Sequence, residues 1–121
     1  MAYKDIIENI LKTNDSIRFA TICDMDGNVS QTGHHESVRN LLSFNENMQL
    51  LKLAAKSWKS RNAFSSKIGN EKTVIVIYEK LKRITISFGD KHLIVITIDV
   101  DTDHDKIIND IIQLEKKHLK I

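Results

Sequence analysis

Residues 73–98 read TVIVIYEKLKRITISFGDKHLIVITI, and this stretch decides the fold. It holds three runs of strand length that are joined by two short polar turns, as expected for antiparallel hairpins. Apolar and polar side chains alternate in residues 83–88, whereas residues 73–78 and 92–98 are apolar on both faces. Such strands must be covered on both faces. One layer of helices covers one side, so the other side needs a further element or a second subunit.

The sequence before these strands predicts a helix and a hairpin. Residues 4–13 place their isoleucine and leucine side chains on one face at helical spacing. Residues 17–24 form a strand, and Asp26-Gly27 marks a tight turn because Gly tolerates positive φ. The returning strand, residues 28–32, is short and polar, so we expect it at an edge of the sheet.

A long helix is expected between the hairpin and the three strands. Residues 33–36 read as a loop, and residues 37–43 either form a helical turn or stay irregular. The body of the helix is predicted at residues 48–67, and Asn45 or Asn47 could be its N-cap.

A last helix follows an acidic segment, residues 99–105, and carries lysines near its end, an arrangement that suits the helix dipole. The predicted order is therefore αββαβββα. This order defines an α+β fold with a five-stranded antiparallel sheet, a long central helix and terminal helices. We expect residues 1–121 to form a single domain, since 121 residues suffice for one core.

Composition excludes several classes of protein. A single cysteine cannot form an intrachain disulfide, so we expect a reducing, cytoplasmic environment. We expect neither a secretory signal nor a membrane span, since no apolar run is long enough. The net charge of +2 does not by itself indicate nucleic-acid binding. The sequence has no nucleotide-binding or hydrolase motif and implies no cofactor.

The acidic segment invites a calcium interpretation. Asp99, Asp101, Asp103 and Asp105 fall at alternate positions, as do the ligands of a calcium loop. However, His104 stands where that loop needs Gly, and a strand instead of a helix precedes the segment. We therefore favour a strand end followed by a helix N-cap and an acidic first turn.

Three other residues are candidates for chemistry. His34 and His35, with a distant Asp or His104, could seed a metal site. Adjacent histidines do not easily face one ion, so we favour a solvated loop that could contact a ligand. Cys23 has no base near it in the sequence and is predicted to be a buried thiol. No catalytic or metal residue is therefore predicted.

The central helix carries the main basic feature. Lys52, Lys56 and Lys59 form a cationic stripe that could meet an acidic partner, and Trp58 lies on the adjoining apolar stripe. The alternative is a solvated helix face. Nucleic-acid binding would rest on this stripe alone.

The sequence resembles the roadblock/dynein-light-chain family and its small archaeal members. The features that carry the resemblance are the element order and length, residues 16–20, the Asp26-Gly27 turn and the closing segment 101–105. The resemblance covers nearly the whole chain and implies a profilin-like, non-enzymatic domain. It implies dimers formed through the central helix and the middle strand, often serving as platforms for small GTPases or as adaptors. The dimer surface implied for this sequence consists of Leu51, Ala55, Trp58, Thr73, Ile75 and Ile77.

Three functions stay open on the sequence. The favoured one is a cytoplasmic dimeric adaptor that binds a small GTPase or another signalling protein. The second is a small-ligand sensor of the PAS or profilin kind, with a pocket between the sheet and the long helix. The third is a metal-dependent enzyme that uses His34, His35 and the Asp99–Asp105 segment.

Overall fold

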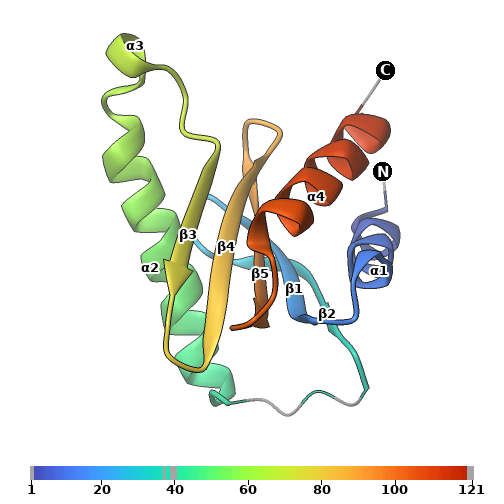
Figure 1. Cartoon of the computed structure of the whole chain (residues 1–121). Helices are drawn as coiled ribbons and strands as arrows, with labels where there is room; N and C mark the ends of the chain where they lie inside the picture. The colour runs from blue at the N-terminus through green and yellow to red at the C-terminus, as the bar shows by residue number, and fades with distance from the viewer. Residues whose placement is uncertain (1, 37, 39–40, 120–121) are drawn as a thin grey trace.

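The computed structural model describes residues 2–36, 38 and 41–119 (Figure 1). Nine elements follow one another in this part of the chain, in the predicted order with one short helix added: α1 (Tyr3–Thr13), β1 (Ile17–Asp24), β2 (Val29–His34), α2 (Phe44–Asn62), α3 (Ser65–Ile68), β3 (Thr73–Ile77), β4 (Leu81–Phe88), β5 (His92–Asp99) and α4 (His104–Leu119).

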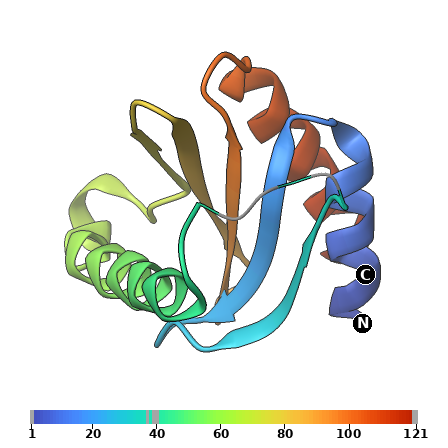
Figure 2. The same ribbon diagram turned by 90° about the horizontal axis from the view of Figure 1, so that it is seen from below.

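The strands form one antiparallel sheet in the order β2-β1-β5-β4-β3. The last strand in sequence, β5, therefore occupies the centre and joins the N-terminal hairpin to the β3–β4 hairpin. Helices α1 and α4 lie on one face of the sheet, and α2 lies on the opposite face (Figure 2). The predicted α+β class and five-stranded sheet are confirmed.

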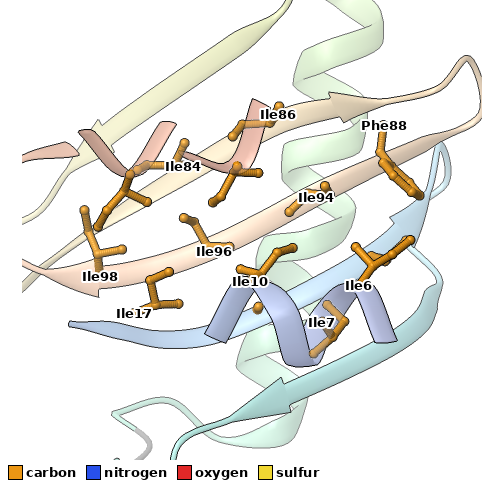
Figure 3. Close-up of a cluster of buried hydrophobic side chains, with 14 residues drawn as sticks. Ile6, Ile7, Ile10, Ile17, Ile84, Ile86, Phe88, Ile94, Ile96 and Ile98 are labelled. Atoms are coloured by element: carbon orange, nitrogen blue, oxygen red, sulfur yellow. The ribbon is translucent and has the colours of Figure 1, made fainter. Parts of the chain in front are cut away.

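The larger core lies between the sheet and the α1/α4 layer (Figure 3). Ile94, Ile96 and Ile98 of β5 point into it, together with isoleucines of both helices. Leu93 and Val95 point to the other face and pack with α2. The doubly apolar pattern of β5 is therefore satisfied within one chain, because α2 is the further element that covers the second face.

Helix α2 begins earlier than predicted. Its N-cap is Ser43, whose hydroxyl accepts a hydrogen bond from the Glu46 amide at 3.1 Å, while the Glu46 carboxylate accepts one from the Ser43 amide at 2.9 Å. This capping box starts the helix at Phe44, so the prediction of Asn45 or Asn47 as the cap was wrong. The predicted helical body over 48–67 is also divided, because α2 ends at Asn62 and α3 is a separate turn.

The second strand is longer than predicted. Gly33 and His34 were expected in a loop, but Gly33 pairs with Ala20 and His34 pairs with Phe19, so both belong to β2. The loop prediction for these two residues was wrong because pairing with β1 continues past the polar segment. Part of the segment predicted as a helical turn or irregular, namely residues 37, 39 and 40, lies outside the described residues.

The β1–β2 turn touches α2. One carboxylate oxygen of Asp24 accepts hydrogen bonds from the amides of Asp26 and Asn28, each at 2.9 Å. Gly27 has a φ of 84°, and a Cβ placed there would lie 2.6 Å from the Lys52 Cα. The glycine is therefore needed both for the turn and for the close approach of the helix.

Candidate functional site

One edge of the sheet, formed by β3, is open. The Ser87 amide donates to the Lys72 carbonyl and the Tyr78 amide donates to the Leu81 carbonyl, so the even-numbered residues between them direct their backbone groups toward β4. Backbone direction alternates along an antiparallel strand. The N–H and C=O groups of the odd-numbered residues of β3 therefore point away from β4, where no strand lies among the described residues.

The side chains of this edge are uncharged and partly exposed. Ile75 pairs with Ile84 and Ile77 with Lys82, which places both on the α1/α4 face of the sheet. Their exposed fractions are 36% and 63%, so the helices of that face do not cover them. The predicted surplus of apolar surface at residues 73–78 therefore lies at this edge, and Tyr78 beside it is 41% exposed.

The opposite edge, β2, is different in kind. Its sequence is largely polar, and its register with β1 shifts between Ile22 and Cys23. Helix α1 packs beside it, so closely that a Cβ at Gly33 would lie 2.8 Å from the Ile7 side chain. Irregularity and a covering helix both discourage pairing with another strand. Of the two edges, β3 is the one suited to association.

The predicted interface residues divide into two groups. Leu51, Ala55 and Trp58 are buried against the sheet of their own chain, where they form a cluster with Cys23, Leu93 and Val95. Thr73, Ile75 and Ile77 lie on the open strand. The structure thus brings the helix residues to the inner side of α2 and leaves only the strand residues at a surface.

The lysine stripe is exposed on α2. Lys52, Lys56 and Lys59 are all accessible, and Lys59 forms a 3.2 Å ion pair with Asp26 of the β1–β2 turn. These residues lie away from the buried stripe of the helix, as the solvated-face interpretation requires. They remain candidates for contact with an acidic partner.

The two histidines are not gathered with the acidic segment. The His34 ring lies 5.2 Å from the Phe19 ring, and its Nδ1 is 2.9 Å from the His35 carbonyl oxygen. Asp99 pairs with Arg18 at 3.2 Å. Across the described residues, no group of three or more His, Cys, Asp or Glu side chains is arranged to hold a metal.

Two further acidic side chains, Asp103 and Asp110, also have structural roles. Asp103 accepts hydrogen bonds from the amides of Asp105, at 3.0 Å, and Lys106, at 3.4 Å, so it caps α4. Asp110 pairs with Lys106 at 3.1 Å. This is the strand end and capped helix that the sequence favoured over a calcium loop.

Cys23 is fully buried under α2. Burial, assisted by the nearby charge of Asp24, raises the pKa of the thiol to about 11. The thiol is therefore protonated at neutral pH and unsuited to nucleophilic attack.

A pocket of about 450 Å³ opens between the sheet and the N-terminal half of α2. Its floor includes Val95 and Thr21, both buried, and its mouth includes the exposed side chains of Leu41 and Phe44. The volume falls within the range of about 300–1,000 Å³ that is usual for ligand sites. The pocket that the ligand-sensor hypothesis requires is thus present.

The polar groups of the pocket were not anticipated. Arg83 and Thr97 form a cross-strand pair, and Thr97 also pairs with Phe19. Nε and Nη1 of Arg83 and the Thr97 hydroxyl are buried, and they have no hydrogen-bond partner among the described residues. The alternation in residues 83–88 suggested an ordinary polar face, but α2 covers part of this face, where Thr85 is buried. The position of α2 is therefore needed to tell that Arg83 and Thr97 line a pocket instead of a solvated face.

Comparison with known proteins identifies the fold. No protein-family model and no curated protein matches the sequence. Among solved structures, a Roadblock/LC7 domain from Streptomyces avermitilis matches at a TM-score of 0.74 and 12% identity, covering 93% of this chain and 90% of that one. The gliding protein MglB from Thermus thermophilus matches at a TM-score of 0.78 and 16% identity, with 93% and 82% coverage.

A profilin is also similar. Profilin II from Acanthamoeba castellanii matches at a TM-score of 0.67 and 14% identity, covering 98% of this chain and 97% of that one. At such identities the likeness defines the fold alone. The chain therefore has the roadblock/profilin-like fold, as its sequence predicts. Across the described residues, no helix is both long and apolar enough to cross a membrane.

Proposed function

We propose that the protein is a dimeric, non-enzymatic adaptor or regulatory module that self-associates through β3. The observation that carries this proposal is the open, uncharged β3 edge with exposed Ile75 and Ile77. Monomeric proteins usually protect an apolar edge strand of this kind with charged side chains, a β-bulge or a covering helix or loop. The similarity to roadblock domains supports the proposal, and one MglB structure of this fold, at a TM-score of 0.68, has a tetrameric arrangement.

The backbone geometry specifies how two copies would pair. Because Thr73, Ile75 and Ile77 direct their backbone groups outward, a two-fold axis through Ile75 would place Thr73 of one copy opposite Ile77 of the other. The two sheets would join into one of ten strands. Leu51, Ala55 and Trp58 would serve this interface by holding α2 against the sheet.

The test is the mass of the protein in solution. Analytical ultracentrifugation at micromolar concentration should show a dimer for the natural sequence. Ile75→Lys should shift it to monomer, because pairing would place two unpaired lysines beside each other on the axis. Ile68→Lys replaces an apolar side chain that is 81% exposed on α3 and should leave the dimer intact. If the natural protein sediments as a monomer at this concentration, the proposal is wrong.

The partner proposed for this module is a small GTPase or another signalling protein, bound by one face of the dimer. The roadblock resemblance supports that class, and the exposed Lys52 and Lys56 supply positive charge for an acidic surface. Reversing both charges should weaken partner binding without altering the sedimentation of the dimer.

A second function, a small-ligand sensor, is favoured by a separate observation. The pocket under α2 has an apolar lining with several polar groups, which is the usual character of a ligand site. Adaptor and sensor functions are compatible in one chain because the pocket lies on the α2 face of the sheet, whereas Ile75 and Ile77 lie on the α1/α4 face, and among the described residues the two surfaces meet only at Tyr78.

A further inference from the structure

The pocket under α2 has a definite electrostatic character. Its charged lining side chains are Arg18 and Arg83, and no carboxylate lines it among the described residues. Nη1 of Arg18 forms an ion pair with Oδ1 of Asp99 at 3.2 Å. Arg83 has no ion pair in the described part of the chain, so its positive charge is the one left for a ligand to balance.

Two residues of the pocket whose donors have no partner within the residues that the structure describes, Arg83 and Thr97, lie side by side. Arg83 of β4 and Thr97 of β5 are direct cross-strand neighbours, and such side chains begin about 5 Å apart. Nε and Nη1 of Arg83 are two donors of one guanidinium group, and the Thr97 hydroxyl is a third donor beside them. A carboxylate accepts charge-assisted hydrogen bonds from a guanidinium group, and it can accept a further one from a neighbouring hydroxyl.

Much of the remaining lining is apolar, although Asn28, Thr32 and Asn47 also contribute polar groups. Leu50, Leu51 and Met48 of α2 face the strand residues Phe19, Leu81 and Val95 across the pocket. The body of a ligand held by Arg83 would lie among these side chains and remove them from water. A strongly hydrated ligand, such as a free phosphate or a sugar, would leave most of this surface without a matching group.

We propose that this pocket binds a small organic carboxylate with an apolar body, whose carboxylate accepts hydrogen bonds from Arg83 and Thr97. The inference rests on the second candidate function and names its class of ligand. It also explains why Arg83 keeps two buried donors without a hydrogen-bond partner in the described part of the chain, which is costly unless a ligand supplies one.

The experiment compares three probes that share an eight-carbon chain: octanoate, octanol and octyltrimethylammonium. Binding is followed by amide chemical shifts in the ¹⁵N-labelled full chain, which also locates the probe. Octanoate should shift amides of β1, β4 and β5 and bind at least about tenfold more tightly than octanol, as expected for hydrogen bonds to a charged donor.

Two variants test the donors. Arg83→Gln should weaken octanoate binding about tenfold or more and abolish the preference over octanol. Thr97→Val keeps the shape of the side chain and should weaken octanoate by a smaller factor, so it carries the test if Arg83→Gln does not fold. Arg61→Gln removes an exposed arginine that pairs with Glu71 outside the pocket and should change nothing.

The unfavourable outcomes are distinguishable. If octanol or octyltrimethylammonium binds in the pocket as tightly as octanoate, the carboxylate class is wrong, while the sensor function stands. If none of the three probes shifts the amides around the pocket, both the ligand class and the sensor function are overturned. Sedimentation of the natural protein tests the adaptor function independently of either result.

Discussion

Gly27 is the residue at which the β1–β2 turn meets the backbone of α2. Its positive φ would be strained with any other side chain, and the space for a Cβ is already filled by Lys52 and the Leu51 carbonyl carbon. Both neighbours are backbone atoms of a helix and cannot move aside singly. The absence of a side chain at position 27 therefore allows the close approach of α2, the helix that covers the pocket.

The substitution Gly27→Ala should lower the free energy of unfolding by about 2–4 kcal/mol, the sum of a left-handed backbone penalty and overpacking. Urea denaturation measures it. Gly89→Ala is the matched control, because Gly89 also has a positive φ of 63° but has no atom within 4 Å of the place that a Cβ would take. It should cost only about 1–2 kcal/mol. Equal losses for the two variants would contradict the close approach as a cause.

Glu115 of α4 gives a pH dependence of known sign. Burial raises its pKa above the ordinary value, although a hydrogen bond from the Gly89 amide opposes the shift. The folded state therefore holds the proton more tightly than the unfolded state, and stability is lost as pH rises through the interval between the two values. At neutral pH the charged carboxylate weakens the fold.

Glu115→Gln should accordingly raise the melting temperature at pH 7, and the gain should shrink toward pH 4. The glutamine oxygen can still accept the hydrogen bond from Gly89. Glu8→Gln, at an exposed position of α1, should show no such trend. A gain that is constant across this pH range would argue against a buried carboxylate as its origin.

At the scale of elements, the capping box of α2 is the clearest local determinant. Ser43→Ala removes the hydroxyl that accepts from the Glu46 amide and should cost about 1 kcal/mol. Ser60→Ala, at an exposed position inside the same helix, should be neutral or slightly stabilising. Thermal unfolding of both variants checks the difference, and similar losses would show that the cap contributes nothing specific.

The elements that the sequence predicted well are those whose own residues determine them. The isoleucine periodicity of α1 and the Asp26-Gly27 turn needed no tertiary information. The start of α2 was also readable, because Ser43 and Glu46 have the spacing of a capping box, yet Asn45 and Asn47 were preferred. His34 was misplaced because its strand character comes from pairing with Phe19, which lies 15 positions earlier.

One part of the candidate site could be predicted from the sequence and another part could not. The apolar surplus of β3 is visible in its uninterrupted run of apolar residues. Arg83 and Thr97 could not be recognised, because alternation along a strand indicates which side chains share a face but not what covers that face. The covering element is α2, whose packing on the sheet depends on Gly27, Trp58 and Val95 together.

At the scale of the whole molecule, β5 ties the two hairpins and both helical layers into one unit. We expect a single cooperative unfolding transition, since neither face keeps its core without β5. Trp58 is the one tryptophan and reports on the α2 face, while far-ultraviolet circular dichroism reports on all elements. The two urea transitions should coincide.

A variant on the other face provides the check. Ile107→Ala removes buried side-chain volume from the core between α4 and the sheet and should cost about 2–5 kcal/mol. It should move the Trp58 fluorescence transition and the dichroism transition by the same amount. A fluorescence midpoint that stays in place would mean that the α2 face unfolds on its own.

The central place of β5 also bears on how the chain is made. A ribosome delivers β1 and β2 first, then β3 and β4, and only afterwards the strand that separates the two pairs. Until residue 99 has left the exit tunnel, the strands of the nascent chain can form only two separate hairpins, and isolated hairpins are at best marginally stable in water. The uncharged β3 strand is therefore synthesised before its sheet exists. The full sheet, and with it the protection of these strands from wrong pairing, therefore forms only after β5 has emerged.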